Sequence, residues 1–263
     1  MSDAVAEQSS EEPVEPVEVE AIHPWTQLPY ERTKLLRLAP LPADRFTGLR
    51  PLRFAQLSTV ERHSDAISYL RLYVSLPDQA ERNSLNMLEV WADHQAKELR
   101  FGPEDGIHTE PGNRGLGRFM LAKGIGWAHE HAANYSVKTI NLSSRDALTD
   151  EARDRRDQAL QGQGFTVDYP GETHHKGRCR ANSVADLTSD WHFEKVQELS
   201  LMDAAAMLKK ADTNLREQDV KIRERDEKIS LLKREDGTLR FSIACLVAFC
   251  AFQAGILIWI AAR

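Results

Sequence analysis

Residues 111–131 read PGNRGLGRFMLAKGIGWAHEH, and this stretch decides the predicted fold. Its first three glycines are Gly112, Gly115 and Gly117. They let the backbone turn tightly and approach a ligand closely, just ahead of a helix predicted over 116–131. The amides that open a helix lack acceptors within it and lie at its positive end, so they can bind a phosphate. The pattern predicts either a phosphate-binding turn or a plain strand-to-helix connection.

Strands are predicted on both sides of this turn. Apolar residues alternate with others over 70–76 and 88–93, which predicts neighbouring antiparallel strands with one buried face. A third strand is expected over 97–101, and an extended piece over 106–109 leads into the turn. The elements expected after the helix are a strand over 137–143, a charged helix over about 149–161 and a strand that follows Gly164.

The motif and this order of elements resemble the GCN5-related N-acetyltransferase superfamily. That family's acetyl-CoA signature is Gln or Arg, two residues of any type, Gly, one residue, then Gly or Ala. The run from Gly112 to Gly117 matches it except at the first position, where Gly112 replaces Gln or Arg. Gly164-Phe165 resembles the family's usual helix-to-strand junction, and residues 37–44 look like its first strand and the entry into its first helix.

The resemblance covers about residues 34–187 and implies an α/β fold, with a mixed sheet flanked by helices and splayed around a pantetheine cleft. It implies acetyl-CoA as the cofactor and transfer of its acetyl group to an amine that the sequence does not identify. The residues that it implies for cofactor binding are Gly112, Asn113, Arg114, Gly115, Leu116, Gly117 and Arg118.

Acetyl transfer of this kind needs a base for the amine proton and an acid for the leaving thiolate. We expect the base to be His108, which precedes the turn, or Glu98, which lies on the strand before it. Many family members place an acidic tyrosine where this chain has Leu160, and Tyr135 and Tyr169 do not match that position. The alternative is therefore a noncatalytic module that binds CoA or a partner protein.

Two groups of histidines contain residue types that bind metals, but the sequence predicts no metal site at either. His129 and His131 are two positions apart, so on a helix they point to different sides. His174, His175 and Cys179 share one connection that offers no fourth ligand. With only three cysteines in the chain, neither a disulfide framework nor a paired zinc motif is expected.

The C-terminal residues predict a membrane-spanning helix. Residues 241–262 read FSIACLVAFCAFQAGILIWIAA, without a formal charge, between Arg240 and Arg263. At about 1.5 Å per residue such a helix crosses the roughly 30 Å hydrocarbon core. The N-terminus lacks the basic start and apolar stretch of a signal peptide. We therefore expect a tail anchor, with the rest of the protein facing the cytoplasm.

A heptad pattern precedes this span, within a stalk predicted over 191–238. Residues at alternating spacings of three and four form the seam: Leu201, Ala204, Leu208, Ala211, Leu215, Gln218, Ile222, Arg225, Ile229 and Leu232. The rest of this stretch is strongly charged, so a lone helix would leave a thin apolar stripe exposed. We expect a coiled coil that makes the protein a homo-oligomer, and a single-helix spacer is the alternative.

The composition limits what remains. The chain has 263 residues with 41% hydrophobic and 28% charged, which allows one core-forming domain, expected over 23–190, plus appendages. Its net charge is −6, and residues 1–22 carry seven acidic side chains and no Lys or Arg. This tail is expected to be disordered, and its charge argues against nucleic-acid binding.

Overall fold

The structure is a computed structural model that describes residues 23–43, 48–77, 85–103, 106–142, 149–170 and 177–262. It divides into two compact units, one ending at Leu199 and the other starting at Ser200. The acidic tail 1–22, which the sequence predicts to be disordered, lies outside the described residues, as does the His174–His175 pair.

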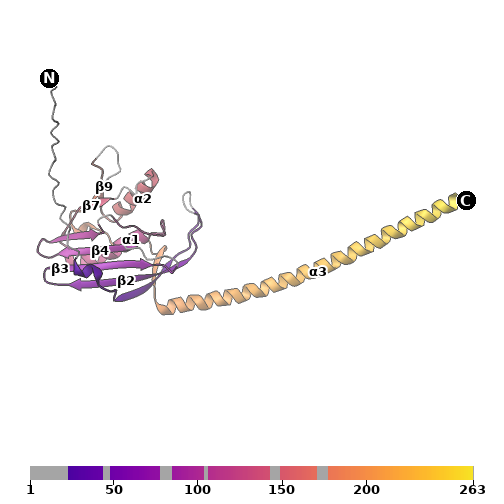
Figure 1. Ribbon diagram of the computed structural model, residues 1–263, viewed down its shortest axis with the longest axis horizontal. Coiled ribbons are helices and arrows are strands. Elements are labelled where there is room, and N and C mark those ends of the chain that lie inside the picture. The colour runs from indigo at the N-terminus through magenta and orange to yellow at the C-terminus, as the bar shows by residue number, and fades with distance from the viewer. Residues whose placement is uncertain are drawn as a thin grey trace, which may run out of the picture. The chain divides into compact units, whose positions relative to one another are not determined.

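The first unit is built on a seven-stranded mixed sheet with the order β10-β1-β2-β3-β4-β5-β6 (Figure 1). All neighbouring strands are antiparallel except β5 and β6, which are parallel. The strands are β1 (Arg32–Leu38), β2 (Arg53–His63), β3 (Ile67–Ser75), β4 (Met87–Asp93), β5 (Glu98–Gly102), β6 (Ser136–Val137) and β10 (Val196–Leu199).

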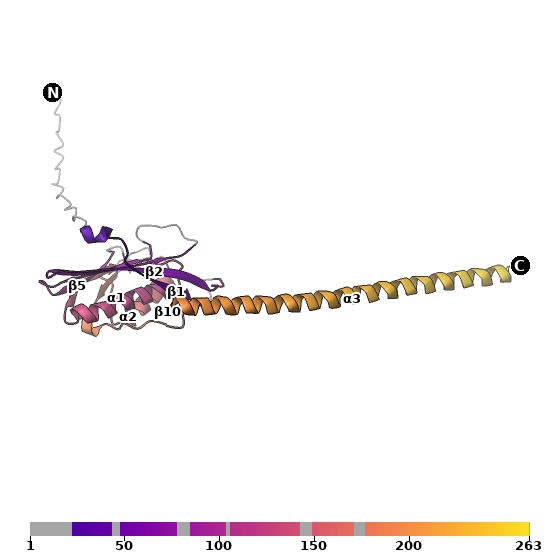
Figure 2. The same cartoon turned by 90° about the horizontal axis from the view of Figure 1, so that it is seen from below.

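The main hydrophobic core lies between this sheet and helix α1 (Leu116–Ala132). The predicted alternation is confirmed, because Leu70 pairs with Val90 and Leu72 with Leu88 in the β3–β4 register, and all four are buried. Figure 2 shows α1 and helix α2 (Asp150–Gln161) on one side of the sheet. Thr149 caps α2 by accepting from the amide of Ala152.

The opposite face of the sheet is also partly covered. The strands therefore bury part of a second face, whereas the sequence predicted only one buried face. The short 3-10 helix η1 (Pro24–Gln27) brings Trp25 onto a cluster of Val60, Tyr69 and Trp91. Arg71 is buried beneath this segment, and its guanidinium donates to the carbonyls at residues 26 and 28. These hydrogen bonds pair two nitrogens of a charged group that would otherwise be costly to bury, while its Nε has no hydrogen-bond partner among the described residues.

A second, three-stranded sheet follows with the order β7-β9-β8. Its strands are β7 (Ile140–Leu142), β8 (Thr166–Asp168) and β9 (Gly177–Arg180). The strand predicted over 137–143 is therefore divided, since β6 pairs with β5 in the large sheet while β7 pairs with β9 in the small one. The predicted strand after Gly164 is confirmed as β8.

The helix entry expected after β1 is not found. None of the described residues 39–43 and 48–52 is helical, and β2 begins at Arg53. The chain instead forms a direct hairpin from β2 into β3, pairing His63 with Ser68 at its closed end. The resemblance suggested a helix here because residues 37–44 look like the family's first strand and the entry into the helix that follows it. The continuous pairing of β2 with both β1 and β3 shows that the later segment is sheet.

Strand β10 closes the other edge of the large sheet, beyond the boundary at residue 190 that the sequence suggested. Its Glu198 binds Lys34 of β1 at 2.8 Å and Lys123 of α1 at 2.6 Å. Burial acts to raise the pKa of Glu198, but the two lysines outweigh it and leave the pKa below its ordinary value. Edge strand, neighbouring strand and helix are thus joined by one carboxylate.

The second unit is one uninterrupted helix, α3 (Leu201–Ala261). A capping box starts it: Ser200 accepts from the amide of Asp203, and the Asp203 carboxylate accepts from the amide of Ser200. The heptad leucines and isoleucines are exposed along it, as are the apolar residues after Arg240. By length and composition α3 is the one helix among the described residues able to cross a membrane.

Candidate functional site

The predicted glycine turn leads directly into α1, and two of its residues have left-handed backbone angles. Gly115 is the N-cap of α1 and has φ of 77°, in the left-handed region. Asn113 also has a positive φ of 57°, whereas Arg114 between them does not. Alternation of this kind turns successive amides toward one point, as in anion-binding nests. The first amides of α1 add to the same end of the helix.

The side chain of Arg114 ties the turn to the segment between β1 and β2. Its side chain is 3% exposed, and its guanidinium donates to the carbonyls of Ala39 at 3.4 Å and Pro51 at 2.8 Å. Arg50 holds the other side by donating to the carbonyl of Asn113 at 2.8 Å. Burial, followed by the charges of Arg53 and Arg50, lowers the pKa of Arg114. The side chain of Arg114 is therefore occupied, and Arg114 could contact an anion in the turn only through its backbone amide.

Basic side chains surround the turn and give it a positive potential. A Cβ atom added at Gly115 would lie 3.5 Å from Cδ of Lys195, so that lysine borders the turn. Arg118, in the first turn of α1, donates to the carbonyls of Asp190 and Gly162, both at 3.3 Å. Burial and then the charges of Lys195 and Arg118 lower the pKa of His192, which Glu194 acts to raise.

Strands β5 and β6, which flank α1 in sequence, separate after a short contact. They pair only at Glu98–Ser136 and Leu99–Val137, and the chain then passes into the other sheet. Phe165, which follows the Gly164 junction, packs edge-on against Phe101 with ring centroids 6.0 Å apart. The two sheets therefore diverge on the side of β5 from which the turn departs.

The two predicted bases lie at opposite ends of β5. His108 is beyond its end, on the side of the turn, where it forms a bridge with Leu85 and its backbone carbonyl accepts from the amide of Asn86 at 2.8 Å. Glu98 begins the strand and lines a shallow surface depression with Lys138, Arg178 and others. Five residues of strand span about 13 Å, so the structure does not bring Glu98 to the turn.

The side chains closest to the family's acid position are occupied elsewhere. Leu160 packs against the main core. Tyr169 donates to Asp157 and accepts from Arg156 at 2.8 Å, and burial followed by the Asp157 hydrogen bond raises its pKa. Tyr135 bonds to His94 at 2.8 Å. The acid of an acyl transfer at the turn is therefore not identified among these residues.

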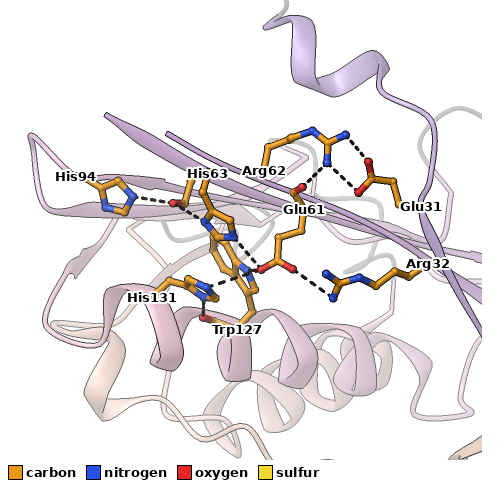
Figure 3. Close-up of polar contacts among 9 residues, drawn as sticks. Glu31, Arg32, Glu61, Arg62, His63, His94, Trp127 and His131 are labelled. Carbon is orange, nitrogen blue, oxygen red and sulfur yellow. Dashed lines mark hydrogen bonds and ion pairs between the residues drawn. The ribbon is translucent and has the colours of Figure 1, made fainter. Parts of the chain in front are cut away.

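The structure also brings together a cluster that the sequence did not indicate. His129 and His131 do point to different sides of α1, as expected: His129 bonds to the carbonyl of Val184, while His131 faces Glu61 and His63 of β2 (Figure 3). The expectation of no metal site rested on helical spacing alone. The overlooked signal is Glu61-Arg62-His63, because residues two apart on a strand share a face.

Comparisons with known proteins leave the class of protein open: no family model, curated protein or solved structure matches this chain. The candidate functional sites of this chain are therefore drawn from its own structure, and they are the turn at the start of α1 and the cluster near the end of α1.

Proposed function

We propose that the protein is a membrane-anchored N-acetyltransferase-like enzyme that binds acetyl-CoA at the turn before α1. The observation that carries this proposal is the backbone of residues 113–115, where φ alternates in sign directly ahead of a helix N-terminus. A pyrophosphate is an anion suited to such a set of amides. Lys195 and Arg50 beside the turn supply compensating positive charge.

The sheet supports the same proposal. A thioester arm that leaves the turn needs an open edge of backbone to run along, and β5 has lost its pairing with β6 beyond Leu99. The divergence of the two sheets at this point resembles the splayed sheet expected for the acetyltransferase family. The order β7-β9-β8 of the small sheet, whose strands all follow α1 in the chain, is compatible with that resemblance.

In the proposed reaction the amine nitrogen attacks the thioester carbonyl, a base accepts the amine proton, and the thiolate leaves and is protonated. His108 is our candidate for the base, because it lies on the turn side of β5. Glu98 is the weaker candidate of the two, since the length of β5 separates it from the turn. Water is available as the proton donor if no side chain serves.

The alternative proposal is a noncatalytic CoA-binding or protein-interaction module. Leu160 favours it, because this position packs an apolar side chain into the core instead of presenting a phenol. A CoA-binding module would use the same turn as the enzyme and would differ from it only in turnover, whereas a protein-interaction module would not require CoA. The enzyme and the CoA-binding module are separated by asking whether bound acetyl-CoA is consumed when amines are supplied.

We further propose that α3 anchors the protein as a tail-anchored, single-pass protein with the first unit facing the cytoplasm. The apolar residues after Arg240 are exposed, and the hydrocarbon core of a membrane would cover them. The heptad residues before them are exposed as well, with Leu215 at 61% and Ile222 at 55%. A second copy of the chain would cover that seam in a coiled coil.

The test is calorimetry of the full-length protein in detergent micelles with acetyl-CoA and with CoA. We expect both to bind the parent, and Gly115→Val to weaken binding at least tenfold, about 1.4 kcal/mol. A valine there strains a residue in the left-handed region, and its Cβ would contact Lys195. Gly126→Ala, farther along α1, is the matched control and should bind like the parent.

Two results would overturn the proposal. One is the absence of binding at millimolar cofactor, and the other is unchanged affinity in a folded Gly115→Val variant. A product assay with labelled acetyl-CoA and a panel of amines then decides between enzyme and binding module. Binding without label transfer to any amine in the panel would favour the module.

A further inference from the structure

The cluster at the other end of α1 has the composition of a metal site. Its members are Glu61, His63 and His131, each of which offers one ligand atom, and these three atoms all lie within 4.8 Å of one another. Oε1 of Glu61 is 3.1 Å from His63 Nε2 and 3.8 Å from His131 Nε2. Ligands at 2.0–2.2 Å from a tetrahedral Zn²⁺ are about 3.3–3.6 Å apart, and the two distances to Glu61 lie on either side of that range.

The elements that supply these ligands are rigid and of different kinds. Glu61 and His63 share one face of β2, while Arg62 between them faces the other side and binds Glu31 (Figure 3). His131 comes from the last turn of α1, which is packed on that same face of the sheet. The rings of His63 and His131 are stacked, with centroids 4.7 Å apart and planes at 23°.

Each ligand is held by a further hydrogen bond. His131 donates through Nδ1 to the carbonyl of Trp127 at 2.9 Å, because a carbonyl can only accept. In the neutral ring this bond leaves Nε2, the atom facing Glu61, with a free electron pair. The Trp127 indole in turn donates to Oε1 of Glu61 at 2.5 Å. Outer contacts of this kind orient metal ligands and fix the histidine tautomer.

His63 begins a chain of buried and half-buried polar groups. Its Nδ1 lies 2.9 Å from the hydroxyl of Ser68, which lies 2.7 Å from Nε2 of His94, and His94 Nδ1 lies 2.8 Å from the hydroxyl of Tyr135. If Nε2 of His63 holds a metal, Nδ1 carries the proton and donates to Ser68. Ser68 is 4% exposed, so this support is built into the sheet.

The site is open on one side. The side chains of His63 and His131 are 43% and 30% exposed, and that of Glu61 is 19% exposed. Three protein ligands with a solvent-facing position are typical of catalytic zinc sites. Two imidazoles and one carboxylate suit Zn²⁺, Co²⁺ or Fe²⁺ and disfavour Ca²⁺ and Mg²⁺, which prefer oxygen ligands.

We propose that Glu61, His63 and His131 bind one divalent transition-metal ion of the Zn²⁺ type, with a water molecule at the open position. The site is independent of the proposed cofactor turn. Leu116 and His131 are at opposite ends of α1, and 15 residues of helix span about 22 Å. Metal binding is measured without CoA, so either proposal can fail alone.

The experiment uses the full-length protein in detergent micelles, freed of metal with a chelator. Co²⁺ is added while visible absorption is recorded, and Zn²⁺ affinity follows from competition with a coloured chelator. We expect one Co²⁺ per chain, with d–d bands of four- or five-coordinate geometry that Zn²⁺ abolishes. Trp127 stacks on His131 with centroids 4.8 Å apart, so bound Co²⁺ should also quench its fluorescence.

Three variants locate the site. His131→Gln and Glu61→Gln should each lose the d–d bands and most of the Zn²⁺ affinity. Glu61→Gln keeps an oxygen for Trp127 to donate to, so it tests the ligand role with little effect on packing. Ser68→Ala removes only the support of His63 and should weaken Zn²⁺ binding about 10- to 100-fold. His129→Gln is the matched control, because His129 bonds to Val184 instead.

The parent and each variant are checked for folding by thermal melting. The proposal is overturned if the folded parent binds no Co²⁺, or if folded His131→Gln binds it as tightly as His129→Gln. The second result would place the metal on other histidines or cysteines of the chain. Equal loss in His129→Gln and His131→Gln would also overturn it, since only His131 belongs to the cluster.

Discussion

Replacing Gly164 by alanine should strongly destabilise the first unit, although the change adds a single methyl group. Gly164 has φ of 92°, and an added Cβ would lie 2.4 Å from the carbonyl oxygen of Asp186. The left-handed backbone costs a non-glycine residue about 1–2 kcal/mol. Overpacking against backbone that cannot rotate away adds about 1–3 kcal/mol. The total is about 2–5 kcal/mol, or a fall in Tm of about 4–20 °C for a domain of this size.

The assay is thermal unfolding of the full-length protein in micelles, followed by tryptophan fluorescence. Gly126→Ala is the control, because its Cβ would meet only Ser189 at 3.8 Å. It removes a glycine from a helix, which should raise stability by about 0.5–1 kcal/mol. Gly164→Asn separates the two causes, since asparagine tolerates positive φ but still adds a Cβ. If Gly164→Ala melts within a degree of the parent, the reasoning about this junction is wrong.

Three other outcomes are expected. Removing residues 241–263 should move the protein from the membrane fraction to the soluble fraction, whereas release of the intact protein by alkaline carbonate would contradict a span. Leu215→Asp with Ile222→Asp should abolish self-association in sedimentation, because two charges would be buried in the seam; a parent that is already monomeric would favour the spacer. The lowered pKa of Glu198 means that its contribution to stability is present above the ordinary pKa and is lost as pH falls through the lowered value. The difference in Tm between the parent and Glu198→Gln should therefore shrink below about pH 4, and a constant difference down to pH 3 would contradict this.

Local patterns in the sequence predicted those helices and strands whose structure is set by residues nearby in the chain. The alternation over β3 and β4 gave their shared buried face, and the charged run after Thr149 gave α2. The helix α1 followed from the turn, since glycines and a long apolar run stand next to each other. In each case the residues that set the structure lie within one or two elements of each other.

The features that the sequence did not predict depend on contacts between segments far apart in the chain. Trp25 covers Tyr69 and Trp91 across more than forty residues, and nothing near η1 indicates that it has a partner. The break between β6 and β7 is set by which strand each part pairs with, not by its own residues. His131 meets Glu61 only because the last turns of α1 lie beside β2, a packing that no spacing along the helix encodes.

A single residue, Ser200, connects the sheet to the long helix. Strand β10 ends at Leu199 and α3 begins at Leu201, and both ends of this link are fixed, one by pairing with β1 and the other by the capping box. Because only Ser200 separates α3 from β10 in the chain, tension applied through α3 would act on β10 and on its hydrogen bonds with β1. Release of those four residues would expose the backbone edge of β1, so mechanical load would act as a change in which strand edge is open.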